Sequence, residues 1–337
     1  MSIFIRTFAC MKKNTLHTNL VTTTKALLHV VSLLSAPLLL TAAILMAACS
    51  GDDASNTPTP TNDKTEIAFN TATTTWHDAT RATTYDNDAA LQTEGEAGGF
   101  TCTAYTNNST TVYFGPTEVK WDGTNSKWYF PDGKRYWPAE GSLDFVAYKP
   151  NVTSYASVPI YNGTAPSFTA TLPMTAAEQD GITELILAFT PNQSKAANAA
   201  GVSLNFLHPF TKIIMKLSST QTNIHIDKII FKSIKKVGTY THNSGWALSD
   251  DAAVNFEASL DADCVHDQVL GTYLMIPQNW AGAIEIQATW TDWGEPFLHH
   301  LYATVPTNWA AGYSYSYTFT ITQFDLRVDT ERFTEQW

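Results

Sequence analysis

Short runs of alternating apolar and polar residues, separated by turn-forming pairs, extend along most of this chain. Alternation with a period of two places successive side chains on opposite faces of a strand. The turn pairs contain glycine and are typical of tight hairpins. The sequence therefore predicts an all-β fold in which many short antiparallel strands form sandwiches. The clearest runs lie at 66–70, 100–106, 142–149, 167–172 and 184–190, and the clearest turns at Asp122-Gly123, Asp132-Gly133, Asn162-Gly163 and Ser244-Gly245.

A polar, alanine-rich segment at 191–201 divides the strand-forming part of the chain. It is bounded by Pro191 and Gly201, which both interrupt regular structure. We therefore expect an N-terminal β-sandwich domain over 65–190, a linker over 191–201 and a C-terminal β-sandwich domain over 202–337.

The N-terminal region has the pattern of an export signal. Residues 26–48 are nearly all apolar; four basic residues precede them and two aspartates follow. This order is typical of a secretory signal peptide, although a stretch of this length also suits an uncleaved membrane anchor. The string Leu-Met-Ala-Ala-Cys at 45–49 resembles a bacterial lipobox, in which small residues precede the lipid-bearing cysteine. We expect a lipoprotein signal peptide over 1–48, a lipid such as palmitate on Cys49, and a flexible polar tether over 49–64.

The charge balance argues against nucleic acid as a partner. The chain has 20 Lys and Arg against 31 Asp and Glu, which gives a net charge of −11. The four charged residues before residue 50 are all basic, so residues 50–337 carry a net charge of −15. An acidic body of this kind repels the phosphate backbone of DNA or RNA.

No motif in the sequence predicts an enzyme, a metal site or a cofactor. Nucleophile elbows, phosphate-binding loops and paired metal-ligand spacings are absent. The adjacent pair His299-His300 would point to opposite faces of a strand, which does not suit chelation of one metal. Cys102 and Cys264 remain outside the signal region. An oxidising compartment permits a disulfide between them, but they fall in different predicted domains, so two buried or lone thiols are the favoured interpretation.

Some of the ten tryptophans are candidates for ligand contact. Trp121 and Trp128 flank a predicted hairpin turn, and Trp290 and Trp293 bracket a short polar pair. If exposed, these four indoles would be candidate glycan contacts. The favoured interpretation is that they fill the sandwich cores, where large aromatic side chains are common.

The segment 121–150 resembles the most recognisable part of the fimbrillin-like family, the type V pilins of Bacteroidales-type anaerobes. In both, an aromatic strand precedes Tyr-Trp-Pro (136–138), a glycine (Gly141) and an alternating strand that ends in proline (143–150). The resemblance covers 65–337. Further matches follow in order: ELILA at 184–188, LNFLHPFTKI at 204–213, the Gly-Thr-Tyr…Trp pattern at 237–246, YLMIPQ at 273–278 and WAAGYSYSYTFTIT at 309–322.

The resemblance implies two tandem transthyretin-like antiparallel β-sandwich domains in a lipoprotein precursor. It also implies a route of assembly. An Arg-specific surface protease cuts the precursor, the first strand leaves, and a strand of another pilin subunit fills the groove by donor-strand exchange.

The residues for this route can be assigned by position. Arg81 and Ala82 match the cleavage element, although Arg81 could equally be an ordinary surface residue. Ile67 and Phe69 alternate with polar or small residues and would form the removable strand. The candidate donor strand carries Phe324, Leu326 and Val328.

These features favour a structural fimbrial subunit, of the stalk or the tip, that serves adhesion or biofilm formation. We expect it at the cell surface, first as an outer-membrane lipoprotein precursor and then in the fimbrium. Its expected partners are other pilin subunits, the protease, the outer membrane through the lipid, and a host or microbial surface ligand. The alternative is a non-polymerising, lipid-anchored surface protein that binds glycans or host ligands. The sequence leaves open the stalk, tip or anchor role, cleavage at Arg81, the ligand, the state of the two cysteines, and the start codon, Met1 or Met11.

Overall fold

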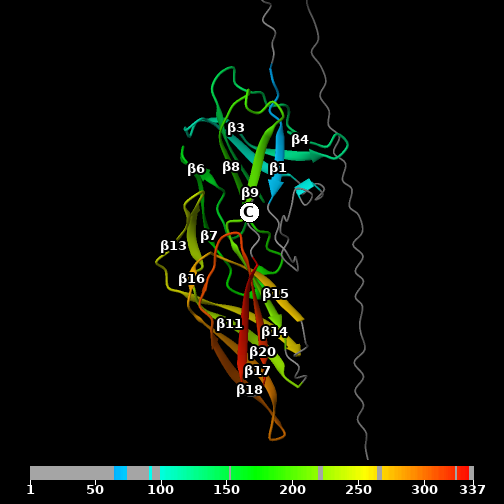
Figure 1. Ribbon diagram of the computed structural model, residues 1–337, viewed down its shortest axis with the longest axis vertical. Coiled ribbons are helices and arrows are strands. Elements are labelled where there is room, and N and C mark those ends of the chain that lie inside the picture. The colour runs from blue at the N-terminus through cyan, green and yellow to red at the C-terminus, as the bar shows by residue number, and fades with distance from the viewer. Residues whose placement is uncertain are drawn as a thin grey trace, which may run out of the picture. The chain divides into compact units, whose positions relative to one another are not determined.

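The structure, a computed structural model, describes residues 64–73, 91–92, 99–151, 153–218, 223–263, 268–322 and 325–333 (Figure 1). Strands dominate these residues, so the predicted all-β fold is confirmed. The first strands are β1 (Phe69–Thr73), β2 (Phe100–Thr106), β3 (Val112–Asp122), β4 (Lys127–Tyr129), β5 (Leu143–Lys149), β6 (Ile160–Tyr161), β7 (Pro166–Thr171), β8 (Ile186–Gln193), β9 (Val202–Leu207) and β10 (Thr211–Leu217). The later strands are β11 (His225–Ile234), β12 (Val237–Thr241), β13 (Gly245–Leu248), β14 (Val254–Asp263), β15 (Gln268–Met275), β16 (Asn279–Trp280), β17 (Ala283–Asp292), β18 (Glu295–Thr304), β19 (Thr307–Asn308), β20 (Ser314–Ile321) and β21 (Leu326–Phe333).

The largest sheet has seven strands in the order β1-β9-β8-β5-β2-β3-β4. Neighbouring strands are antiparallel except β1 and β9, which run parallel. The central strand β5 is buried along its whole length, because it lies between two apolar cores. Phe145 and Ala147 face one core, whereas Val146 and Tyr148 face the other. The alternation that predicted this strand therefore supplies two cores at once.

A second sheet, in the order β13-β12-β7-β6, packs over one of these cores. Its strands β12 and β13 come from residues 237–248 and pair with β7 through β12. The segment 191–201 joins β8 to β9, and these two strands are neighbours in the seven-stranded sheet. The described residues all belong to one compact unit. The division into domains at 191–201 stays a prediction.

The remaining long strands form a sandwich of two four-stranded sheets, β15-β10-β20-β21 and β14-β11-β17-β18. Their inward side chains make one large core. Near its end Trp280 and Trp309 stack with ring centroids 5.1 Å apart, and each indole N–H finds an acceptor. Because both N–H groups are hydrogen-bonded, the two indoles are buried without the free-energy cost of an unpaired donor. The tandem transthyretin-like arrangement in detail stays a prediction.

The short helix α2 (Ala176–Gln179) links the two halves. It begins after Thr175, whose hydroxyl accepts a hydrogen bond from the Glu178 amide at 3.2 Å. The Gln179 side chain donates to the Leu274 carbonyl at 3.0 Å and accepts from the Leu274 amide at 2.8 Å. This pair of hydrogen bonds ties α2 to β15. Over the residues that the structure describes, no helix has the length and apolar character needed to cross a membrane.

Candidate functional site

Several residues selected from the sequence lie outside the described residues. They are the signal segment 1–48, the lipidation site Cys49, the cleavage pair Arg81 and Ala82, Cys264 and Phe324. Their predicted roles stay predictions. The other selected residues are described, and those at the start of the chain define the clearest candidate site.

Residues 64–73, which we call the plug, lie at the edge of the seven-stranded sheet. The first part of the plug pairs with residues 135–137: the Ile67 amide donates to the Arg135 carbonyl at 2.8 Å, and the Trp137 amide donates to the Thr65 carbonyl at 3.0 Å. The second part is β1, which pairs in parallel with β9 from Phe69 opposite Val202 onward. The plug thus satisfies backbone groups on two separate walls.

The side chains of the plug alternate as the sequence predicts. Ile67 and Phe69 are buried, whereas Glu66, Ala68 and Asn70 are exposed. Phe69 is only 5% exposed. Burial of such a side chain contributes about 1.5–3 kcal/mol to the free energy of folding. Two buried anchors at alternate positions are the pattern by which an added strand is held on a sheet.

Phe69 enters a cluster of three phenylalanines. Its ring centroid lies 5.9 Å from that of Phe100, 5.6 Å from Phe130 and 5.7 Å from Phe145, each in an edge-to-face arrangement. Rings at these distances and angles attract one another beyond the effect of burial alone. The cluster draws on β2, on β5 and on the residue after β4. Phe69 therefore closes a core that the rest of the sheet builds.

The wall formed by residues 134–137 adds weaker contacts. Trp137 is buried and packs edge-to-face on Phe145, with centroids 5.9 Å apart. Lys134 Nζ lies 2.6 Å from Glu66 Oε2, and this hydrogen bond raises the pKa of Lys134. Both charged side chains are well exposed, so the pair adds little stability. Apolar contacts and the backbone hold this part of the plug.

The opposite wall is β9. Its backbone ladder with its other neighbour, β8, lies near one end, and farther along the Thr190 hydroxyl of β8 donates to the Ser203 carbonyl at 3.0 Å. The β8–β9 pairing covers Leu187 with Leu207 and Ala188 with Phe206. Just beyond it, Glu184 Oε2 lies 2.8 Å from His208 Nδ1, and both side chains are fully buried. This contact fixes the start of β8 to the end of β9. The β9 segment opposite the plug thus depends on β1 for most of its regular backbone pairing.

Sequence reasoning found the two anchors of the plug but not the residues that receive them. Phe100 and Phe130 lie in separate runs, and nothing local indicates that they meet at Phe69. A usable signal was present, because the alternating run at 202–207 places Val202, Leu204 and Phe206 on one face. All three face the same core as Phe69.

The proposed donor strand lies in β21, at the edge of the C-terminal sandwich, where it pairs with β20 alone. Leu326 is buried in the large core and Val328 packs against it, whereas Arg327 and Asp329 are exposed. The alternation over these residues is the one that the sequence predicts. Leu326 and Val328 have the same spacing as Ile67 and Phe69.

The four selected tryptophans differ in exposure. Trp128 is buried against Phe100, and Trp290 is buried and stacks on His299 with centroids 3.5 Å apart. Neither ring has a free face for a sugar, so their selection as glycan contacts does not fit their surroundings. Trp121 is half-buried, and Trp293 is fully exposed at the turn between β17 and β18.

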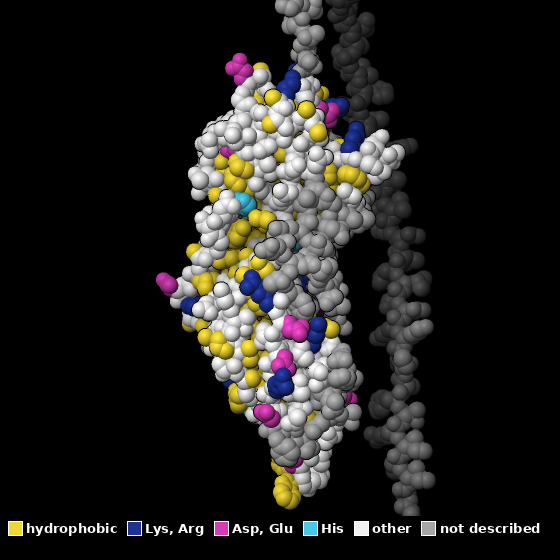
Figure 2. Space-filling view, viewed as in Figure 1, with side chains coloured by type: hydrophobic (Ala, Val, Ile, Leu, Met, Phe, Trp, Pro, Cys, Tyr) yellow, Lys and Arg dark blue, Asp and Glu magenta, His cyan; other side chains and the backbone are white. Residues whose placement is uncertain are grey.

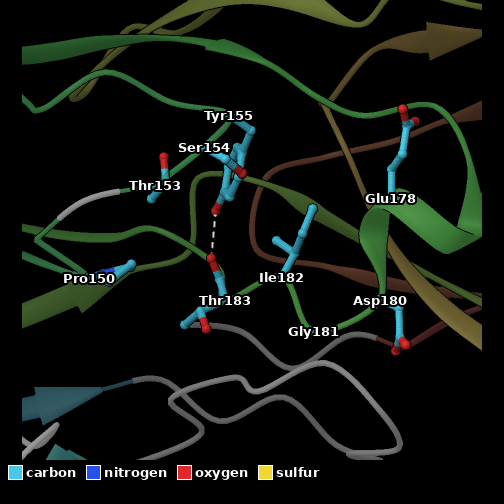
Figure 3. Close-up of a pocket in the computed structure, with 9 residues that line it drawn as sticks. All are labelled: Pro150, Thr153, Ser154, Tyr155, Glu178, Asp180, Gly181, Ile182 and Thr183. Carbon is cyan, nitrogen blue, oxygen red and sulfur yellow. Dashed lines mark hydrogen bonds between the residues drawn. The ribbon is translucent and has the colours of Figure 1, made fainter. Parts of the chain in front are cut away.

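Two further places among the described residues carry groups capable of chemistry: the thiol of Cys102 and a cavity beside α2. Cys102 is buried in β2, and burial raises the pKa of its thiol, which makes it a poor nucleophile. A cavity of about 350 Å³ lies beside α2 (Figure 3). Within the described residues, no group of three or more His, Cys, Asp or Glu could hold a metal ion. The cavity contains a Tyr155 hydroxyl that donates to the Thr183 carbonyl and two carboxylates, and its lining is Pro150, Thr153, Ser154, Tyr155, Glu178, Asp180, Gly181, Ile182 and Thr183.

Comparison with known proteins identifies the family. The sequence profile described as fimbrillin-like matches residues 80–337. The chain belongs to the fimbrillin-like family. This is a family of structural fimbrial and adhesion proteins and not an enzyme family. No curated protein matches the chain.

Several solved structures match the chain over most of its length. A fimbrial protein from Bacteroides vulgatus is 16% identical, covers 80% of this chain and 99% of its own, and has a TM-score of 0.56. A Bacteroides uniformis protein provisionally assigned to cell adhesion is also 16% identical, covers 81% and 98%, and has a TM-score of 0.49. The tip fimbrial protein Mfa3 from Porphyromonas gingivalis is 10% identical, covers 80% and 99%, and has a TM-score of 0.41. The first of these supports the fold of this fimbrillin-like chain.

Proposed function

We propose that this chain is a fimbrial subunit that polymerises after loss of its plug. It is exported as a lipoprotein, held at the outer membrane through Cys49, and cut after Arg81 by an Arg-specific surface protease. The cut releases everything before Ala82, including β1. The subunit then joins others in a fimbrium that serves adhesion or biofilm formation.

The plug carries this proposal. Its two anchors, Ile67 and Phe69, enter the apolar core from the sheet edge, while the other six strands of the sheet are paired to one another. Its departure would unpair the backbone of β9 and expose the phenylalanine cluster. A vacant edge with an apolar pocket is what a donor strand requires. The family match also begins at residue 80, so the part that would remain after cleavage is the part shared with the family.

The donor in this proposal is β21 of a neighbouring subunit. Leu326 and Val328 would take the places of two anchors with the same spacing. The charged side chain between them, Arg327, would stay in solvent, as Ala68 does between the anchors of the plug. Release from β20 would cost backbone hydrogen bonds, and pairing with β9 would restore them.

The test is the fate of the precursor when Arg81 is changed. Treatment of the mature precursor with an Arg-specific protease should yield a new N-terminus at Ala82 and a ladder of oligomers in unheated gels. Arg81→Ala should give neither product, whereas the neighbouring Thr80→Ala should give both. Oligomers of unchanged length distribution from Arg81→Ala would contradict the proposal.

A second candidate function, ligand binding at the cell surface, is favoured by one observation. The Trp293 side chain is fully exposed. Its backbone is left-handed, with φ +54°, which is unusual for a bulky residue. Such a position gives packing no benefit and suits a contact with a glycan or host ligand. Trp293→Ala should abolish binding on a glycan array and leave the oligomer ladder intact. Binding that survives this substitution would remove the candidate.

A further inference from the structure

Strand β18 is an open sheet edge that lacks the usual protections. It lies last in the order β14-β11-β17-β18, so within the described residues it has a strand neighbour on one side only. It pairs with β17 over ten residues without a break in register. Natural edge strands avoid unwanted pairing by being short, carrying bulges, or bearing charged residues or proline. Beyond its first two residues, Glu295 and Pro296, β18 carries none of these devices.

The other described edges are protected. The edge strands β4, β6 and β13 have two to four residues, and β1 has five, half the length of β18. The pairings of β14 and β15 each contain a register shift. Strand β21, the edge of the facing sheet beside β18, carries charged side chains at Arg327, Asp329, Glu331 and Arg332. This contrast sets β18 apart as an edge built to be paired.

The exposed side chains of β18 support the same conclusion. Phe297 is 50% exposed, Leu298 53% and Tyr302 58%. Leu298 and Tyr302 lie on the outer face of the sheet, opposite Thr289 and Glu285 of β17. Figure 2 also shows hydrophobic side chains at the tip of the hairpin that joins β17 and β18. Large apolar side chains along a free backbone ladder favour association.

We propose that β18 pairs antiparallel with β18 of a second copy of this chain, and so joins two subunits side by side across a two-fold axis. A pairing centred on His300 places Leu298 of each copy opposite Tyr302 of the other. In this register even-numbered residues face even-numbered residues and odd-numbered residues face odd-numbered ones, so the outer faces stay on the same side of the joined sheet. A symmetric contact of this type needs only one self-complementary patch.

The charge distribution favours a second copy of the chain as the partner of β18. Residues 50–337 carry a net charge of −15, so two copies repel each other over most approaches. From Pro296 to Thr304, β18 has no Asp, Glu, Lys or Arg. The ion pair below it, Glu285 with Lys232 at 2.5 Å, is internally compensated. Two copies can therefore approach along β18 with less repulsion than elsewhere, and backbone hydrogen bonds form along the whole strand.

This contact is separate from strand exchange and can be tested without it. The mature chain with Arg81→Ala, produced without lipid, keeps its plug, so failure of the cleavage model does not affect the result. Analytical ultracentrifugation should show a concentration-dependent doubling of mass. Leu298→Lys should weaken this dimer at least tenfold, because it removes the apolar contact of Leu298 with Tyr302 from each half and places on the edge a charge of the kind that prevents strand pairing. Leu298 is exposed on the outer face, so the substitution should leave folding unchanged, which a thermal melt would verify.

Val269→Lys is the matched control. Val269 is 41% exposed on the edge strand β15, so the variant makes the same kind of change at a protected edge and should leave the dimer unaltered. Hydrogen exchange gives an independent reading, since alternate amides of β18 should become protected only as the protein concentration rises. A monomer at all concentrations, a dimer that survives Leu298→Lys, or protection of β18 that requires a different protein or peptide would each overturn the proposal.

Discussion

Strands β1 and β21 both lie at a sheet edge, one near each end of the described chain, yet different interactions hold them. β1 has five residues in parallel pairing, and its Phe69 anchor is surrounded by three aromatic rings. β21 has eight residues in antiparallel pairing, and Leu326 and Val328 cover the rim of a core that is already large. Side chains dominate the first contact and backbone pairing the second. A strand held by anchors can be replaced by any strand with anchors at the same spacing, whereas a strand held by its ladder loses little by forming the same ladder elsewhere.

The largest expected effect is at the anchor of β1. Phe69→Ala should lower the free energy of unfolding by about 3–5 kcal/mol, because it leaves a cavity among Phe100, Phe130 and Phe145. Chemical denaturation of the uncleaved mature chain would measure the change. Asn70→Ala is the control, since this exposed side chain contributes one hydrogen bond to the Ala200 carbonyl. Equal losses from the two variants would show that backbone pairing, and not the anchor, holds β1.

A smaller effect is expected at β21. Leu326→Ala should cost about 2 kcal/mol, at the low end for a buried leucine, since Leu326 is 8% exposed at the rim of the core. The same denaturation experiment would measure it, with Arg327→Ala as the exposed neighbour for control. If Leu326→Ala proved more damaging than Phe69→Ala, the contrast between the two strands would be reversed and β21 would be a poor donor.

The smallest expected effect is a difference in the pH dependence of stability between the C-terminal sandwich and the plug. In the C-terminal sandwich, Glu285 accepts hydrogen bonds from Lys232, Gln287 and His300, and the bond from Lys232 contributes most to lowering its pKa to about 2. A depressed pKa stabilises the folded state above the unfolded value of about 4.5, and this contribution is lost as the pH falls toward 2. Wild type should lose about 2–4 °C more in Tm than Glu285→Gln between pH 5 and pH 2. The plug is held by apolar rings and backbone hydrogen bonds, so Phe69→Ala should keep the pH dependence of wild type. If Phe69→Ala reduced the pH-dependent loss of Tm as much as Glu285→Gln does, the pH effect would not be confined to the C-terminal sandwich.

The sequence predicted the strands better than their partners. The run at 142–149 became β5, and the anchors Ile67 and Phe69 are buried in alternation as expected. Local periodicity carries this information, because it depends only on which side chains face a core. The parallel pairing of β1 with β9 joins residues more than a hundred positions apart, and no local pattern specifies it. The same holds for β12, which pairs with β7 from the other side of the predicted linker.

The family motifs acquire a structural meaning at the candidate site. Tyr136-Trp137-Pro138 forms one wall beside the plug, 143–150 contains β5 beneath it, and 204–213 begins within β9. The resemblance identified these segments but could not show that they lie together. A motif gives only the order of residues, and the fold brings the segments into contact. The tryptophans show the converse limit. Trp290 and Trp293 are three residues apart and similar in sequence context, yet one is buried and the other fully exposed.

The position of β12 and β13 has a mechanical consequence. Their neighbours in sequence, β11 and β14, belong to the C-terminal sandwich, so the chain leaves that sandwich, adds two strands to the sheet of β7, and returns. The Gln179–Leu274 hydrogen bonds reinforce the same junction. A pulling force applied to the ends of a subunit would therefore meet these strand pairings and hydrogen bonds, not a single extensible connector. Such a body resists elongation as one stiff element, which suits a component of a filament exposed to flow.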